Sequence, residues 1–139
     1  MIINNTPINA RQKFGAVKAK ADFPERLAEV YIGSPVSAGK IVDKLSRVAD
    51  AQRNNSLYDL HIGVTDKGGI SMSVFNKVKN QFDSIMNDFI GKKFTEVHNT
   101  DDLVKVLGET SEQLTQRNTT YWGTKNGVEN MKLGVLEKE

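Results

Sequence analysis

"LYDLHIGVTDKGGISMSVF", residues 57–75, differs from the rest of the chain in the period of its apolar residues. Apolar side chains recur at every second position, first from Tyr58 to Val64 and again from Ile70 to Val74. The connection between the two runs, "TDKGG", is rich in glycine. A period of two on both sides of such a connection is typical of a β-hairpin. We therefore predict one hairpin, with "DKGG" as its turn, because this segment lacks the context of a phosphate-binding loop.

A helical pattern follows the hairpin directly, over residues 76–92. Asn76 is its predicted N-cap, and Gly91, Lys92 and Lys93 suit its C-terminus. The apolar side chains recur about once per helical turn, which places them on one face. These side chains are Val78, Phe82, Ile85, Met86, Phe89 and Ile90.

Two helices are predicted before the hairpin. The longer one follows Ser34 and Pro35, since proline is favoured at the first position of a helix. Pro24 is expected to open the shorter one, over residues 24–32. The buried stripe of the longer helix is expected to consist of Ala38, Ile41, Val42, Leu45, Val48 and Ala49.

The C-terminal part of the chain is predicted to hold several short elements. One helix should start near Asn99 or Thr100, with Asp101 and Asp102 in its first turn, where the helix dipole favours acids. Gly108 is expected to interrupt this helix.

After this break, Thr110 or Ser111 is expected to cap a separate turn that ends near Leu114. A loop over residues 117–127 and a last helix over residues 128–137 complete the prediction. The chain as a whole is therefore predicted to form a predominantly helical α+β fold, in one compact domain over residues 1–139.

The composition excludes several classes of function. The chain has no cysteine, which excludes disulfides, thiol nucleophiles and cysteine-bound zinc. Its two histidines make a metal site unexpected, and His61 falls on the opposite strand face from Leu60 and Ile62, where we expect it to face solvent. The net charge of +2 does not indicate nucleic-acid binding. The N-terminus reads as neither a signal peptide nor a membrane span, so we expect a cytoplasmic protein.

"RNTTYWGTKNG", residues 117–127, contains the single tryptophan. Tyr121 and Trp122 are surrounded by side chains that form hydrogen bonds, and Gly123 and Gly127 allow close approach of the backbone. An aromatic surface edged by donors is typical of a ligand pocket. The alternative is that the two aromatic side chains close the end of the hydrophobic core.

Four stretches of the sequence resemble the NADAR family, also called YbiA-like. "FGAVKAKADFPERLAEVYIGSP" (14–35) is similar to the family's "FQAxK … SP" segment, and "SPVSAGK" (34–40) to its "SPxxAxR/K" helix start. "IMNDFIGKKF" (85–94) with "LVKVLGETSEQL" (103–114) resembles its central pattern. "TTYWG" (119–123), with "GVENMKLGVLEK" (127–138), resembles its "D-x-[YF]-W-G … G-x-N-x-L-G-x-L-M" signature. The resemblance implies a NADAR-like helical fold and cleavage of N-glycosidic bonds or ADP-ribose chemistry.

The sequence departs from the family pattern at its acids. Arg11 and Gln12 stand where the family has a Glu-His pair, and Thr119 stands where it has an acid. Cleavage of an N-glycosidic bond needs a carboxylate to stabilise the developing charge or to activate water. Arginine stays protonated and threonine carries no charge, so neither can replace it. The remaining candidate acids are Asp22, Glu109 and Glu129. Such a loss of acids would fit a fast-diverging source such as a phage.

Three hypotheses follow for the function. The first is a diverged NADAR-like protein that binds a ribosylated or nucleotide-derived ligand resembling ADP-ribose, without catalysis. The second is an active N-glycosidase, a hydrolase with relocated acids. The third is a small interaction or regulatory protein that contacts a protein partner through Trp122 or the hairpin edge.

The first two hypotheses share one set of predicted ligand-binding residues. No cofactor, metal or membrane is expected in either case, and nucleic acid only as a ribosylated substrate. The predicted ligand-binding residues are Arg11, Lys18, Asn118, Thr119, Tyr121, Trp122, Gly123 and Asn130.

Overall fold

The structure is a computed structural model that describes residues 16–136. In this part of the chain four helices combine with one four-stranded sheet, which confirms the predicted α+β class with helices predominating. In chain order the elements are β1 (Val17–Ala19), α2 (Phe23–Val30), α3 (Pro35–Ala51), β2 (Tyr58–Val64), β3 (Ile70–Asn76), β4 (Gln81–Phe82), α4 (Ser84–Phe94) and α5 (Thr100–Glu129).

The predicted hairpin is confirmed and forms the centre of the sheet. β2 and β3 pair antiparallel over seven residues each, with Leu60 opposite Val74 and Val64 opposite Ile70. Gly68 has a φ of 86° in the turn, a conformation that favours glycine. The strand order is β1-β2-β3-β4, with β1 parallel to β2. The pattern did not predict β1 and β4, which are three and two residues long.

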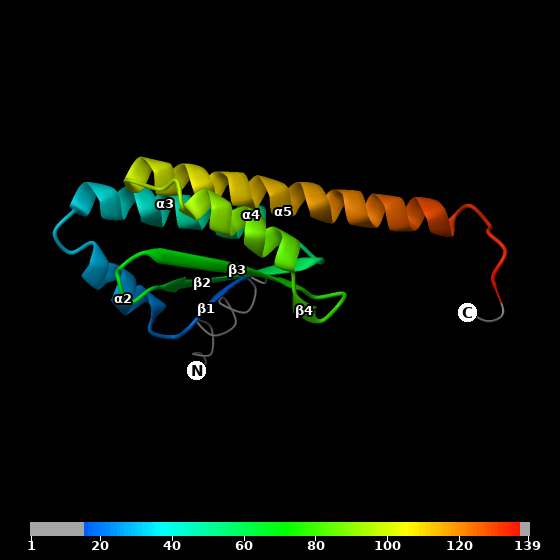
Figure 1. Ribbon diagram of the computed structural model, residues 1–139, viewed down its shortest axis with the longest axis horizontal. Helices are drawn as coiled ribbons and strands as arrows, with labels where there is room; N and C mark the ends of the chain where they lie inside the picture. The colour runs from blue at the N-terminus through cyan, green and yellow to red at the C-terminus, as the bar shows by residue number, and fades with distance from the viewer. Residues whose placement is uncertain (1–15, 137–139) are drawn as a thin grey trace, which may run out of the picture.

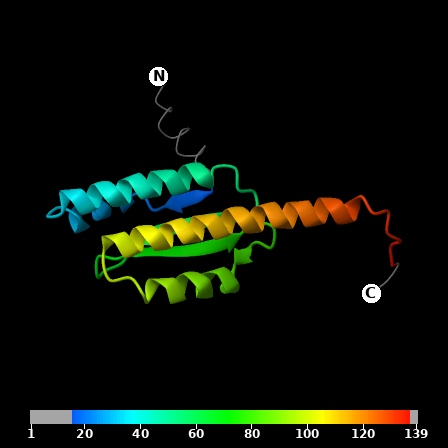
Figure 2. The same ribbon diagram turned by 90° about the horizontal axis from the view of Figure 1, so that it is seen from above.

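Helices α3, α4 and α5 form a layer over one face of the sheet, as Figures 1 and 2 show. The side chains that alternate along β2 and β3 explain this arrangement, because Leu60 and Val74 are almost fully buried beneath the helices. On the helices they meet a single core cluster whose most buried members are Ile41, Met86, Ile90, Leu107 and Leu114. The core therefore lies between the sheet and the helical layer.

The helices before the hairpin lie where the sequence predicts them. α2 and α3 each have a proline in their first two positions. In the predicted stripe of α3, Ile41 and Val48 are buried and Ala38, Leu45 and Ala49 are partly buried. Val42 is the exception, since it is exposed.

The helix predicted over 76–92 begins later, at Ser84. Asn76 ends β3 instead of capping a helix, and its Oδ1 accepts a hydrogen bond from the Lys79 N–H in the following turn. The N-cap is Asp83, whose Oδ1 accepts from the Met86 N–H. Val78 and Phe82 fall in the turn and in β4 and are exposed. The predicted helix start was wrong because the turn and β4 continue the apolar spacing by chance.

The C-terminal elements form one helix instead of several. α5 begins at Thr100, within the predicted start, with Asn99 as its N-cap, and continues for 30 residues to Glu129. Gly108 does not interrupt it: a Cβ there would lie 3.0 Å from Lys44 Nζ, so the glycine gives the α3 lysine room against α5. Thr110 and Ser111 are buried within the helix and cap nothing.

The last two predicted elements were also wrong. Residues 117–127, predicted as a loop, belong to α5. A helix over 128–137 does not form in the described part of the chain, because α5 ends at Glu129 and residues 130–136 are not helical.

Candidate functional site

The C-terminal part of α5 extends beyond the sheet and the other helices (Figures 1 and 2). We call residues 119–136, the last turns of α5 and the segment that follows, the arm. Every described residue from Gly123 to Leu136 is exposed. A helix of 30 residues is about 45 Å long, longer than the body needs to cover its sheet. The arm is therefore a surface that the rest of the fold does not cover.

An aromatic pair marks the point where α5 leaves the body. The rings of Tyr121 and Trp122 meet edge to face, with centroids 4.8 Å apart. Tyr121 packs against the core, and the Trp122 Nε1–H donates to Asn118 Oδ1 at 3.1 Å. The same oxygen accepts from the Leu57 N–H, so Asn118 connects the arm to the start of β2. Each ring is half-buried, and the predicted closure of the core holds for Tyr121, whereas the predicted ligand pocket stays a prediction.

The core-facing stripe of α5 continues into the arm. Leu107, Leu114, Tyr121 and Val128 recur at every seventh position, which places them on one side of the helix. Leu107 and Leu114 are each 1% exposed, whereas Val128 is 43% exposed. The side of the helix that builds the core is thus presented to solvent as soon as the body ends.

Charges on the arm form a local pair. Lys125 Nζ lies 2.6 Å from Glu129 Oε2 and 5.9 Å from the centroid of the Trp122 ring. The hydrogen bond and the charge of Glu129 raise the pKa of Lys125. This pair neutralises the exposed end of α5 and leaves its apolar side chains uncovered.

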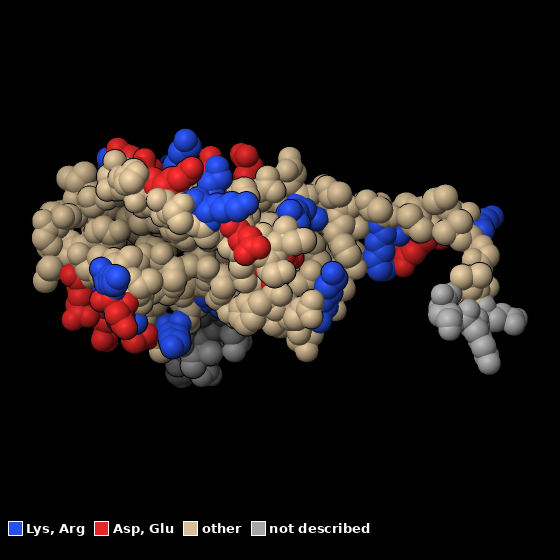
Figure 3. Space-filling model, viewed as in Figure 1, with Lys and Arg blue, Asp and Glu red and all other residues tan. Residues whose placement is uncertain are grey.

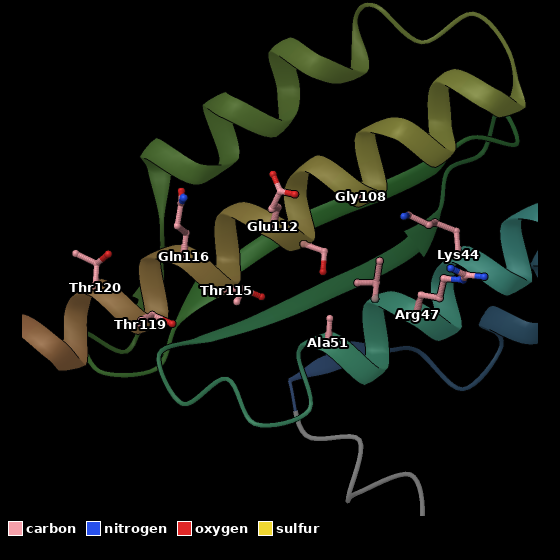
Figure 4. A pocket seen from close by; sticks show the side chains of 11 residues that line it. Lys44, Arg47, Ala51, Gly108, Glu112, Thr115, Gln116, Thr119 and Thr120 are labelled. Carbon is pink, nitrogen blue, oxygen red and sulfur yellow. The ribbon is translucent and has the colours of Figure 1, made fainter.

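A groove of about 550 Å³ lies between α3 and α5 and reaches the arm (Figure 4). Lys44 and Arg47 stand on the α3 side, and Glu112 and Gln116 on the α5 side. Thr119 lines its end next to the arm. The groove thus combines two cations, one acid and several hydroxyl and amide groups.

A buried amide connects the end of α3 to two residues that line this groove, Ser111 and Thr115. Gln52 Nε2 donates to the Ser111 carbonyl oxygen at 2.8 Å, and it lies 2.9 Å from both Ser111 Oγ and Thr115 Oγ1. Asn55 Nδ2 donates to Gln52 Oε1 and to the Leu114 carbonyl. These bonds hold the end of α3 against α5, so the groove walls have a fixed spacing.

Beneath the root of the arm, Tyr58 joins β2 to the start of α4. Its hydroxyl lies 3.2 Å from Asp83 Oδ2, to which it donates. Burial raises the pKa of Tyr58, and the charge of Asp83 adds to this effect, while Arg117 opposes it. Arg117 belongs to α5 and lies just before the arm. The body thus interacts with charged side chains of α5 at Asp101, Glu109 and Arg117, whereas the ion pair of the arm, Lys125 with Glu129, lies within the arm itself.

The structure brings together five of the predicted ligand-binding residues. Asn118, Thr119, Tyr121, Trp122 and Gly123 follow one another on α5, across the root of the arm.

The other predicted ligand-binding residues lie apart from these five. Asn130, the C-cap of α5, follows Trp122 by about 12 Å along the helix. Lys18 lies on β1, where its Nζ is 3.2 Å from Asp59 Oδ2. Arg11 lies outside the described residues.

The three candidate acids lie far apart. Asp22 precedes α2, whereas Glu109 and Glu129 both lie on α5, about 30 Å apart along the helix. The Glu109 Oε1 atom lies 3.6 Å from Lys93 Nζ of α4, and Glu129 pairs with Lys125 within the arm. The acid that does line the groove is Glu112, which the sequence did not indicate. Its signal would have been its spacing from Thr115 and Thr119 on one helix, and the predicted break at Gly108 hid that spacing.

Two classes of site are absent from residues 16–136. This part of the chain contains no group of three or more His, Asp or Glu side chains that could hold a metal ion. Within the same range, no helix combines the length and apolar character needed to cross a membrane.

No model of a protein family matches this chain, and neither does a curated protein or a solved structure. The resemblance to the NADAR family therefore stays a prediction that rests on the quoted motifs. The arm and the groove between α3 and α5 are two features of the fold that bear on its function.

Proposed function

We propose that this chain is a small interaction protein whose arm binds a helical segment of a protein partner. The observation that carries the proposal is the continuation of the core-facing stripe, from Leu114 through Tyr121 to Val128, past the end of the body. The body covers this apolar stripe in the first half of α5, and the stripe is exposed in the arm. Its spacing is the one with which helices pack against each other, so the exposed half can pack against a further helix.

The composition of the arm supports the need for a partner. Gly123 and Gly127 each disfavour a helix by about 1 kcal/mol relative to alanine, and Thr119, Thr120 and Thr124 add about 0.5 kcal/mol each. A helical segment of this length is marginal in water even with good helix formers. Since the body does not cover the arm beyond Trp122, packing against another chain is the remaining source of stability.

The chemistry of the arm indicates what kind of partner fits. Figure 3 shows that the visible face of the arm is mostly uncharged, with small adjacent groups of opposite charge. Aromatic side chains, here Tyr121 and Trp122, are the commonest strong contributors to protein interfaces. The exposed apolar side chains beyond them are Val128, Met131, Leu133, Val135 and Leu136. An amphipathic helix with an apolar stripe and little net charge matches this surface.

Site-specific photo-crosslinking tests the proposal. A photoreactive amino acid replaces Val128 in the full chain, expressed in its source cells, and Val36 serves as the matched control because it is an exposed valine at the start of α3. We expect a discrete crosslinked product from position 128 and none from position 36.

Hydrogen exchange of the purified chain completes the test. We expect amides 119–129 to exchange fast in the isolated chain and slowly in the crosslinked complex. No product from position 128, together with slow exchange of these amides in the isolated monomer, would contradict the proposal.

A second candidate function is favoured by the groove between α3 and α5. Its volume lies in the range of small-molecule sites, roughly 300–1,000 Å³, and Lys44, Arg47 and Thr119 suit the phosphate and hydroxyl groups of a ribosylated ligand. Under this alternative the chain binds an ADP-ribose-like molecule beside Trp122, with or without N-glycosidase activity.

The lone tryptophan gives a direct test of this alternative. We expect ADP-ribose, NAD or a ribose phosphate to change Trp122 fluorescence, and Lys44→Ala to abolish the change. Lys67→Ala, on the hairpin turn, is the control for lost charge. No change with any of these compounds would reject the ligand, and release of a free base from a ribosylated substrate would distinguish a hydrolase from a binding protein.

A further inference from the structure

A second, smaller cavity lies on the sheet face opposite α3, α4 and α5. It has a volume of about 230 Å³ and is formed by α2, the segment before it, and the β2–β3 hairpin. Neither the arm nor the α3–α5 groove shares a lining residue with it. Its polar lining consists of Lys20, Asp22, Arg26, His61, Ser71 and Ser73.

We propose that this cavity binds a small tetrahedral oxyanion, either free phosphate or the phosphate group of a monoester. The lining supplies the donors that such a group requires: an ammonium group from Lys20, a guanidinium group from Arg26 and the hydroxyls of Ser71 and Ser73. The imidazole of His61 adds a fifth group that can donate.

The strand register explains why these side chains converge. His61 is directly opposite Ser73, and Gly63 is directly opposite Ser71, so the imidazole and both hydroxyls share one face of the hairpin. Leu60, Ile62 and Val64 point to the other face because neighbouring residues of a strand alternate. The sequence-based expectation for His61 is thus confirmed for its face, although the side chain is half-buried instead of free in solvent.

Two aromatic rings hold the imidazole in place. The His61 ring stacks on Phe75, with centroids 6.1 Å apart and an interplanar angle of 12°. The Phe82 ring meets it edge-on, at 5.5 Å and 87°. A ring fixed on two sides presents its nitrogens in a constant direction, which reduces the entropy lost when a ligand binds.

Gly63 keeps the floor of the cavity open. A Cβ at this position would lie 3.1 Å from Ser71 Oγ, tighter than an ordinary contact. Any side chain there would therefore push the serine hydroxyl aside. A glycine opposite a serine gives an oxyanion access to both the hydroxyl and the backbone.

The charges around the cavity favour an anion over a cation. Lys20 and Arg26 outnumber Asp22 in the lining. Arg26 also contacts the hairpin turn, where its Nη2 lies 3.6 Å from Asp66 Oδ1 and 3.4 Å from the Thr65 carbonyl. Asp66 is fully exposed, so water screens this pair and leaves the guanidinium available.

The proposal concerns binding and includes no reaction of the lining side chains. Lys20, Arg26, Ser71, Ser73 and His61 enter it as donors to the oxyanion. Asp22, one of the three candidate catalytic acids, also lines the cavity, where its negative charge reduces the net positive charge of the lining.

A titration with inorganic phosphate tests this site, with the His61 ring resonances followed by NMR at constant ionic strength. We expect saturable shifts with phosphate and tighter binding of a monoester such as phenyl phosphate, because the cavity has room beyond the phosphate group. Arg26→Gln should weaken binding about tenfold or more, since it removes a charge-assisted hydrogen bond. Arg26→Lys should restore part of the loss, and Arg53→Gln, on a separate exposed ion pair, should have no effect.

Gly63→Ala gives an independent readout of the cavity itself. It should weaken phosphate binding while Arg26 and Lys20 stay in place, and the amide spectrum of each variant shows whether the fold is retained. Equal His61 shifts with chloride and phosphate, or phosphate shifts that persist unchanged in Arg26→Gln, would overturn the proposal.

Discussion

The two halves of α5 have the same backbone conformation and different sources of stability. Residues 100–118 pack against the core, and Asn99 caps their first turn by accepting the Asp102 N–H at 2.9 Å. Residues 119–129 bury no side chain fully, and their one ion pair, Lys125 with Glu129, is exposed. Exposed pairs contribute at most about 1 kcal/mol. A continuous helix therefore does not imply continuous stabilisation, and this difference supports the proposal that the arm binds a partner.

The largest test of this difference compares Leu114→Ala with Val128→Ala, one residue from each half on the same side of the helix. Leu114 is 1% exposed, so its truncation leaves a cavity and should lower the free energy of unfolding by about 2–5 kcal/mol. Val128→Ala should leave the unfolding free energy of the isolated chain within about 0.5 kcal/mol of the wild type. Urea titration followed by circular dichroism measures both. A loss above 1 kcal/mol for Val128→Ala would mean that the arm packs on its own body.

A smaller effect is expected at the boundary between the halves. Asn118→Ala removes the acceptor for the Trp122 Nε1–H and for the Leu57 N–H. The Leu57 N–H keeps Asn55 Oδ1 as a second acceptor at 3.0 Å, and Trp122 can turn to water, so the cost should be about 1 kcal/mol.

Trp122 reports the local consequence of the same variant. Its fluorescence anisotropy should fall in Asn118→Ala, because the ring loses the bond that fixes it. Asn126→Ala, an exposed asparagine in the arm, should change neither quantity. An unchanged anisotropy in Asn118→Ala would show that Tyr121 alone holds the root of the arm.

A third effect is the loss of stability at alkaline pH, which we expect to depend on the body and the first half of α5 and not on the arm. Burial raises the pKa of Tyr58 above its ordinary value of 10.0, so above about pH 10 the unfolded chain loses this proton while the folded chain keeps it. Stability is therefore complete below pH 10 and should fall as the pH rises further.

Tyr31, whose pKa burial also raises, contributes in the same direction. In Tyr58→Phe the urea midpoint should fall less between about pH 9 and about pH 11 than in the wild type. Truncation of the arm should leave this difference unchanged. An equal fall in Tyr58→Phe would assign the alkaline loss to other groups.

The sequence predicted the fold well where a pattern reports burial. The hairpin alternates because one side of each strand faces the core, and Pro24 and Pro35 indicated the starts of α2 and α3. The prediction fails in α5 because the polar side chains and glycines at 117–127 are also typical of a loop. These residues are helical, and they are polar because the body does not cover this part of the helix.

The candidate sites were less predictable, since each joins segments far apart in the sequence. Gly108 looked like a break because its role, room for Lys44 of α3, depends on how two helices pack. The cavity proposed to bind an oxyanion likewise combines Arg26 with His61 and Ser73, three residues on different elements. The residues from Asn118 to Gly123, which include the aromatic pair Tyr121–Trp122, lie together in the chain and could therefore be singled out from the sequence.

The smallest expected effect comes from the glycines of the two halves. Gly123→Ala with Gly127→Ala should raise the helical content of the arm, since each change favours a helix by up to about 1 kcal/mol and a Cβ meets nothing within 4 Å at either position. The urea midpoint of the body should not move, because both glycines lie beyond Tyr121, the last side chain of α5 that packs against the core.

Gly108→Ala is the matched change in the first half. The added Cβ meets the flexible end of Lys44, which can shift, so a gain below about 1 kcal/mol should appear in the midpoint itself. Gly108→Ala would then change the urea midpoint of unfolding, whereas Gly123→Ala with Gly127→Ala would change only the hydrogen exchange of nearby amides. This result would mean that the two halves of α5 unfold independently. A shift of the midpoint in the Gly123 and Gly127 double variant would instead show that α5 unfolds as one unit, and the arm would then need no partner to stay helical.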